Sequence, residues 1–424
     1  MVFFNKKQVT KIFVIGFVLL PLTLLTFYTL STKASPTTHI KQSLLTELDN
    51  FEYIGAFRFP VNIFGSSRLS YINGNFTINE QTNSIFIAGH QHHQAIAEFS
   101  IPVLKQEFKP ASLNLSKNLQ VFIPFLKNKS RIKNPQGLNR ITGMEIIEGE
   151  LFVNAAQYYD APGDNSYSTL IFRDSSDLKN SKIDGLFTLK GLMHSAGWLS
   201  KLSGKWRDIF GASYLHGYAG NIPINSRLSM GPSAFVSNID AFAGIDEHDG
   251  LIPTRALMDF SIRNPMMKDL YNKSGNNNMW TELSSAYYGF IVPNTDYYLV
   301  LGTSGGHESG IGYKAIQING NQCGGPCAID PSDYYNFYWI FDVNDFLDVK
   351  NKKRKPWELS PKHFGKLQLP FSPKNMRKSL ISADFDNKNN ILYILLENID
   401  RSQSSYEIAP VMLAYKLRAT NQDG

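Results

Sequence analysis

Residues 143–155, with the sequence GMEIIEGELFVNA, are the clearest indication of the fold class. They place two apolar runs, Gly143–Ile147 and Leu151–Ala155, on either side of the short turn Glu148-Gly149-Glu150. A second pair, Ile381–Phe385 and Ile391–Leu396, repeats the arrangement nearer the C-terminus. Short extended runs joined by tight turns are typical of antiparallel hairpins and meanders.

Similar strand signals recur along most of the chain, while amphipathic helices are few. The helical signals are one short capped helix at Asp345–Val349 and a longer interruption at Leu192–Phe210. The remaining strand candidates are rich in β-branched and aromatic residues and are bounded by Gly, Asn, Asp or Pro. They are Glu52–Phe57, Asn75–Ile78, Ser84–Ala88, Ala95–Ile101, Thr169–Arg173, Ser233–Val236, Ala286–Val292, Tyr297–Gly302, Tyr338–Asp342 and Met412–Leu417.

So many strands in one open sheet would leave long exposed edges, so the meanders must close or stack. A β-propeller closes them radially. We therefore predict an all-β fold, a β-propeller of about five to seven blades after an N-terminal apolar helix. Pairing of the last strand, Met412–Leu417, with the first, Glu52–Phe57, would close the ring. Paired β-sandwiches are the alternative, because no repeat signature recurs.

The N-terminus carries a membrane anchor or an export signal. Lys6, Lys7 and Lys11 precede the uncharged run Ile12–Leu30, which at about 1.5 Å per residue is long enough to cross a hydrocarbon layer of ~30 Å. The lysines are expected on the cytoplasmic side. We predict a membrane-anchored protein whose large domain lies outside the cytoplasm, or a secreted or periplasmic one if the segment is cleaved as a signal peptide.

The chain divides accordingly. Residues 1–34 form the signal-anchor or signal peptide, 35–50 a linker, 51–418 a single β-propeller-like domain and 419–424 a polar tail.

The charge is mildly basic, with 42 Lys plus Arg against 36 Asp plus Glu. The one dense basic run is Lys350–Lys355. Because an exported domain does not encounter nucleic acid, we exclude nucleic acid as a partner. We interpret this run as a solvated loop, and contact with anionic lipid or an acidic polymer is the alternative.

Cys323 and Cys327 are the only cysteines, and Gly324-Gly325-Pro326 separates them. In an oxidising compartment this spacing predicts one small disulfide that pins a loop.

Gly89-His90-Gln91-His92-His93 is the densest cluster of titratable groups. In an extended chain His90 and His92 share one face, as two ligands of a metal would. The third ligand would come from elsewhere, so metal, metal-free catalysis or substrate binding, and a plain polar loop all stay open; the sequence specifies no cofactor. Candidates for that third ligand are His194, His216 and His307.

Several segments resemble an uncharacterised group of exported bacterial β-propeller-like proteins. The resemblance spans most of the domain and implies a single propeller, but it implies no activity. It rests on Gly89-His90, Ala95–Pro102, Tyr158-Tyr159-Asp160, Ser226–Pro232 and Tyr338–Glu358.

The order His90, Tyr158, Arg173 is also similar to that of propeller-fold polysaccharide lyases. Cleavage of a uronic-acid polymer by β-elimination needs a cation for the carboxylate and a base for the C5 proton. This similarity implies that His90, Tyr158 and Arg173 are catalytic and converge. The further candidates for ligand binding are His92, His93, Arg227, His307 and Glu308.

Three functions follow from these patterns, and the sequence does not decide whether the protein is an enzyme. The first is an exported, membrane-tethered propeller that binds a polymeric ligand such as a carbohydrate. The second is a polysaccharide lyase that acts on acidic polysaccharide. The third is an envelope scaffold that binds another protein.

Overall fold

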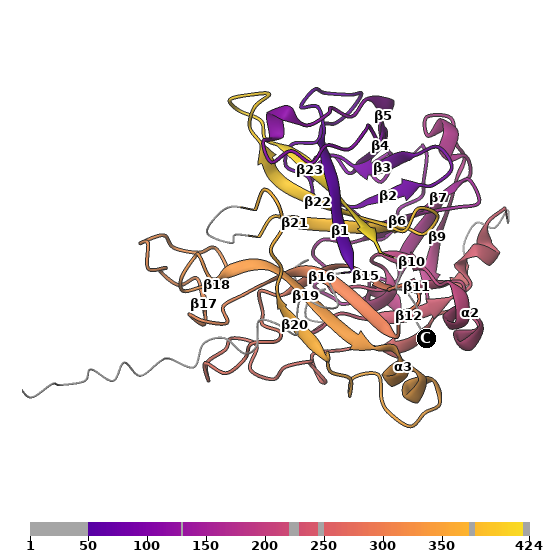
Figure 1. The fold of residues 1–424 in the computed structure, drawn as a ribbon. Helices are drawn as coiled ribbons and strands as arrows, with labels where there is room; N and C mark the ends of the chain where they lie inside the picture. Colours follow the sequence, from indigo (N-terminus) through magenta and orange to yellow (C-terminus); the bar gives the residue numbers. More distant parts are fainter. Residues whose placement is uncertain (1–49, 129, 220–228, 245–249, 373–377, 419–424) are drawn as a thin grey trace, which may run out of the picture. The chain divides into compact units, whose positions relative to one another are not determined.

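Strands dominate the computed structural model, which describes residues 50–128, 130–219, 229–244, 250–372 and 378–418. The described residues form five sheets of four or five strands and one two-stranded sheet (Figure 1). The five larger sheets are the blades of a β-propeller. This confirms the all-β prediction, places the blade number at the low end of the predicted range, and excludes the paired sandwiches.

Each blade is a meander in which successive strands pair antiparallel. Blade 1 consists of β2 (Phe76–Asn79), β3 (Ser84–Ala88), β4 (Ala95–Ser100) and β5 (Asn118–Pro124). Blade 2 consists of β6 (Arg140–Ile147), β7 (Glu150–Ala156), β8 (Tyr167–Phe172) and β9 (Ile183–Leu189), to which β13 (Leu251–Ile252) adds in parallel.

Blades 3 and 4 follow the same plan. Blade 3 consists of β10 (Leu199–Lys201), β11 (Tyr214–His216), β12 (Ala234–Ser237) and β14 (Arg255–Met258). Blade 4 consists of β15 (Ser285–Ile291), β16 (Tyr297–Gly305), β19 (Tyr334–Asp342) and β20 (His363–Lys366).

Blade 5 joins the two ends of the domain. Its strands β21 (Leu380–Asp386), β22 (Ile391–Asp400) and β23 (Ala409–Leu417) come from the C-terminal part, and its outer strand β1 (Phe51–Arg58) from the beginning. Phe51 pairs with Leu417 and Arg58 with Val411. The predicted closure of the ring by the first and last strands is therefore confirmed, and Figure 1 shows β1 beside β23.

The first strand of each blade is the innermost one. β2 contacts β6 and β21, β6 contacts β10, and β15 contacts β10 and β21, so these five strands form a closed ring. We call the face at which they begin the entry face and the opposite one the exit face.

The core fills the spaces between neighbouring blades. Phe57, Phe99 and Met412 belong to a cluster shared by blades 1 and 5, whereas Phe86 and Phe172 belong to one shared by blades 1 and 2. Since alternate residues of a strand point to opposite faces, one strand can supply both clusters.

The insertion after β16 carries a small separate hairpin. β17 (Ile311–Tyr313) pairs with β18 (Pro326–Ala328), and a disulfide joins Cys323 to Cys327 in the same insertion. Figure 1 shows this hairpin projecting from blade 4.

Helices within the described residues are short. They are α2 (Gly204–Phe210) and α3 (Val343–Lys350), with 3-10 turns η1 (Pro110–Ser112), η2 (Ser175–Asp177), η3 (Leu192–Ser195) and η5 (Ile239–Phe242). In the part of the chain that the structure describes, no helix combines the length and hydropathy of a membrane span. The predicted anchor Ile12–Leu30, the linker up to residue 49 and the tail 419–424 lie outside the described residues.

The basic run Lys350–Lys355 is the end of α3 and the turn after it. Lys350 Nζ donates to the carbonyl of Ile209, Lys353 pairs with Asp348 at 3.5 Å, and Arg354 pairs with Asp345 at 2.7 Å. Three of its cations are thus engaged within the fold.

Candidate functional site

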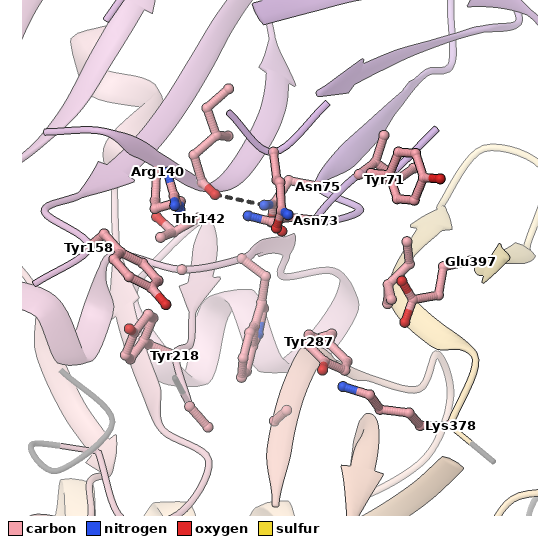
Figure 2. Close-up of a pocket in the computed structure, with 18 of the residues that line it drawn as sticks. Tyr71, Asn73, Asn75, Arg140, Thr142, Tyr158, Tyr218, Tyr287, Lys378 and Glu397 are labelled. Atoms are coloured by element: carbon pink, nitrogen blue, oxygen red, sulfur yellow. Dashed lines mark hydrogen bonds between the residues drawn. The ribbon is translucent and has the colours of Figure 1, made fainter. Parts of the chain in front are cut away.

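A cavity of about 560 Å³ lies at the entry face, around the mouth of the ring of innermost strands. Residues at or just before the start of β2, β6, β10, β15 and β21 line it, together with residues of neighbouring loops. Its aromatic lining is Tyr71, Tyr158, Trp198, Tyr218 and Tyr287, and its amide lining is Asn73, Asn75, Gln91 and Asn398. Its charged lining is Arg140, Lys378 and Glu397, and His92 also lines it. Figure 2 draws 18 of the lining residues as sticks around the space and labels ten of them.

Arg140 and Tyr158 form one wall. Arg140 pairs with Ala156 in the hairpin of β6 and β7, so Tyr158, two residues further on, lies beside it. The backbone N–H of Tyr158 donates to Asn139 Oδ1 at 2.8 Å, which holds the turn. The Arg140 guanidinium carbon lies 4.4 Å from the centre of the Tyr158 ring, within the range of a cation–π contact.

Hydrogen bonds tie this wall to the neighbouring blades. Asn75 Nδ2, just before β2, donates to Ile141 O in β6 at 2.7 Å, the bond drawn in Figure 2. Thr142 Oγ1 donates to the carbonyl of Ala196, which precedes β10. The first bond joins blade 1 to blade 2 and the second joins blade 2 to the segment that leads into blade 3, so the two bonds connect the first three blades around the cavity.

Lys378, Glu397 and Tyr287 form the opposite wall (Figure 2). Lys378 Nζ lies 4.9 Å from the centre of the Tyr334 ring. The Tyr334 hydroxyl raises the pKa of Lys378 above its usual value against the opposing effect of burial, so the amine is charged at neutral pH. Burial raises the pKa of Glu397, and Lys378 opposes that rise.

One residue of the predicted histidine cluster, His92, lines this cavity, and His90 and His93 lie beside His92. The ring of His90 lies 5.5 Å from that of His92 and 4.6 Å from that of His93. His93 Nδ1 lies 3.0 Å from Ser67 Oγ. Burial, then the neighbouring cationic side chains, lowers the pKa of both His90 and His93, so they favour the neutral form.

Arg173 lies far from this cavity. It follows the end of β8, whereas Tyr158 precedes the start of that strand. Six residues of extended chain span roughly 20 Å. Arg173 pairs with Glu150 at 3.0 Å and with Asp184 at 2.8 Å, near the exit face. The predicted convergence of His90, Tyr158 and Arg173 is therefore not what the structure shows.

His307 and Glu308 also lie outside the cavity. His307 Nε2 lies 2.7 Å from Ser304 Oγ, which is fully buried, and His307 Nδ1 lies 2.7 Å from the carbonyl of Asn277. Glu308 pairs with Lys366. These two residues stabilise the loop after β16, while Arg227 lies outside the described residues.

The other histidines do not assemble with this cluster. His194 pairs with Asp259, and His216 is fully buried with Nε2 at 2.6 Å from Ser237 Oγ. Among the described residues no three His, Cys, Asp or Glu side chains gather as a metal site would require.

A second, smaller cavity of about 300 Å³ opens at the exit face. It lies between the ends of β2, β6 and β10, and its carboxylates exceed its cations. Burial, then the charge of Asp384, raises the pKa of Glu145 in its lining. Its charged lining is Glu80, Glu145, Glu148, Asp240, Lys201 and Arg207.

No protein-family model matches the sequence, and no curated protein shows significant similarity to it. Among solved structures, the chain is similar to a GH32 β-fructofuranosidase of Bombyx mori (11% identity, TM-score 0.39), covering 85% of this chain and 61% of that enzyme. It therefore spans less than two thirds of the length of that enzyme.

Two further structures are covered over nearly their whole length. A GH43 endo-arabinanase from Bacillus licheniformis has 8% identity, a TM-score of 0.38, and coverage of 86% of this chain and 98% of the enzyme. A DUF4221 protein from Bacteroides vulgatus has 10% identity, a TM-score of 0.32, and coverage of 87% and 98%. Similarity at this level carries no information about activity.

Proposed function

We propose that the protein binds a carbohydrate in the entry-face cavity. The observation that carries this proposal is the composition of the lining, in which five aromatic rings and four carboxamide side chains surround one space. A cavity of about 560 Å³ is in the size range of small-molecule sites.

The aromatic rings suit the apolar faces of sugars. Tyr71 is 49% exposed and Tyr158 is 40% exposed, so both rings present area to a ligand. A tyrosine offers a flat apolar body and a polar hydroxyl at its tip, which matches the mixed surface of a pyranose ring.

The amides suit sugar hydroxyl groups. Each carboxamide of Asn73, Gln91 and Asn398 has both donor and acceptor atoms, and a hydroxyl group also donates and accepts. Such a lining can meet several hydroxyl groups without burying an unpaired one, which would cost free energy.

Binding fits this lining better than hydrolysis does. Most glycoside hydrolases place two carboxyl groups on either side of the scissile bond. Among the described lining residues Glu397 is the one carboxylate. Burial raises its pKa, and Lys378 opposes that rise. The lyase alternative that uses Arg173 is not supported either, because Arg173 pairs with Glu150 and Asp184 elsewhere.

The test is a saccharide panel presented to the full-length chain, with affinities measured by titration calorimetry. We expect Tyr158→Ala to weaken binding at least about tenfold, because the ring is a contact surface. Tyr313→Ala is the matched control, since Tyr313 is 63% exposed on the β17 hairpin and does not line the cavity. The proposal fails if no saccharide binds or if Tyr158→Ala binds as well as the control; capture of an envelope protein instead would favour the scaffold function.

We propose in addition that the protein is exported and tethered through Ile12–Leu30. The disulfide between Cys323 and Cys327 supports this, since such bonds persist in oxidising compartments. Alkylation of the native protein followed by mass measurement with and without reduction tests it. Two free thiols in protein taken from cells would contradict the proposal.

A further inference from the structure

Arg140 is a cation of the cavity wall that no carboxylate neutralises within the described residues. Its Nη1 donates to the carbonyl of Asn139 at 2.9 Å, and its guanidinium lies over the Tyr158 ring. A guanidinium carries five N–H donors, so most of its donors remain for a ligand. Figure 2 shows Arg140 at the edge of the space, across from Lys378 and Glu397.

The opposite wall does not offset this charge. Lys378 and Glu397 are close enough to shift each other's pKa, and they carry opposite charges. Burial also favours the neutral form of Glu397, which leaves less negative charge in the cavity. The described lining therefore has a positive balance, with two cations against one carboxylate, and Arg140 is the cation that has no carboxylate beside it.

We infer that the ligand is an acidic saccharide whose carboxylate binds Arg140. This rests on the proposed binding of carbohydrate and adds its chemical class. A guanidinium can donate two parallel hydrogen bonds to a carboxylate, and such charge-assisted pairs are among the stronger hydrogen bonds.

The local structure prepares Arg140 for that role. The residue begins β6, and its register opposite Ala156 is fixed by the hairpin. The Tyr158 ring supports the guanidinium from one side, and the Asn139 side chain and carbonyl hold both residues of the pair. A site that sits on a strand and is braced in this way loses little side-chain entropy on binding.

The experiment compares uronic-acid hexamers with their carboxyl-reduced counterparts, which differ only in the charged group. Calorimetry on the full-length chain should give the wild type a preference of about tenfold or more for the acidic form. Arg140→Gln should reduce that preference at least about tenfold, and the readout is the ratio of the affinities for the acidic and the neutral form measured on the same variant. Arg140→Lys should retain only part of the preference, because an ammonium cannot form the two-bond fork.

Arg418→Gln is the matched control, because Arg418 is an exposed arginine that pairs with Glu52 on the outer strands. It should keep the wild-type preference. If Arg140→Gln does not fold, Arg140→Lys tests the same point. Equal affinity for acidic and reduced forms in the wild type, or an unchanged ratio in the Arg140 variants, overturns the inference and leaves carbohydrate binding intact. Failure of every saccharide to bind overturns both.

Discussion

At the residue scale, the histidines differ in whether water reaches them. His92 is exposed at the cavity, whereas His216 has no exposed surface and lies against Ser237. Burial lowers the pKa of His216 to about 4, so the folded protein holds this ring neutral. An unfolded chain restores its ordinary pKa near 6.5.

This difference predicts a dependence of stability on pH. Between about pH 6.5 and pH 4 the unfolded state binds a proton at His216 and the folded state does not, so the free energy of unfolding falls as the pH falls. The full effect is about 3.5 kcal/mol, because the pKa values of the unfolded and folded states differ by about 2.5 and each pKa unit corresponds to ~1.4 kcal/mol. Urea unfolding at several pH values should show a shallower acid loss in His216→Gln than in the wild type. An identical slope in the two proteins would refute this, and His92→Gln, which changes an exposed ring, serves as the control.

The positions of individual residues along their strands explain which residues of the cavity lining the sequence can predict. Tyr158 and His92 are predictable because they stand in polar clusters directly after strands, and both line the cavity. Arg140 and Lys378 are not predicted from the sequence, because the alternation of apolar and polar residues does not show which strand of a blade is innermost. The sequence feature that would have predicted these two residues is their position, just before or at the start of the first strand of each meander. Arg173 is wrongly assigned to the site when strand direction is ignored, since it stands at the end of β8 opposite to the cavity.

At the scale of elements, the innermost strands of neighbouring blades lie so close together that some of their positions have no room for a side chain. A Cβ atom on Gly143 of β6 would lie 2.0 Å from the carbonyl oxygen of Gly197, next to Trp198 in the cavity lining. A residue without a side chain is thus required at position 143, where blade 2 contacts blade 3.

Gly143→Ala should therefore destabilise the protein. Overpacking commonly costs about 1–3 kcal/mol, and the obstacle here is backbone, so we expect the upper end. The melting temperature should fall and saccharide binding should weaken, since the strands must separate beside Trp198. Gly324→Ala provides the comparison, because a Cβ atom added to Gly324 would meet nothing within 4 Å. Equal melting temperatures for the two variants would show that the contact is unimportant.

Element prediction succeeds where runs are long and turns tight, as in Gly143–Ala155, and fails where strands are short. β10 has three residues, Leu199–Lys201, and lies inside the segment Leu192–Phe210, for which the sequence suggests a helical interruption. Only Gly204–Phe210 is α-helical there. A strand of three residues forms because neighbouring blades supply its contacts, and no local pattern can report those contacts.

At the scale of the whole molecule, β1 closes the ring by pairing with β23, and we expect stability to depend on this closure. Phe57 of β1 has no exposed surface, pairs with Met412 of β23, and packs against Phe59 at 5.3 Å between ring centres. Loss of this contact opens blade 5 at its outer strand.

Phe57→Ala should cost about 3–5 kcal/mol, as for other buried phenylalanines. Phe108→Ala should change stability by less than about 0.5 kcal/mol, because Phe108 is 67% exposed. Guanidinium unfolding followed by fluorescence measures both. Similar midpoints for the two variants would mean that closure contributes little to stability.

Closure is predictable from the sequence, whereas the number of blades is only bracketed. The match between Glu52–Phe57 and Met412–Leu417 follows from their positions at the two ends of the domain, and the register confirms it. The number of blades is predicted by dividing the length of the domain by the length of one blade. Long insertions, such as the one that holds the disulfide, add residues that belong to no blade, so the predicted number stays at about five to seven.

The pairing of Phe51 with Leu417 has a practical consequence for handling the protein. Both residues lie at the exit-face end of blade 5, level with the end of β21, while the cavity lies where β21 begins. A surface or fusion partner attached through either strand end would leave the binding side facing the solution.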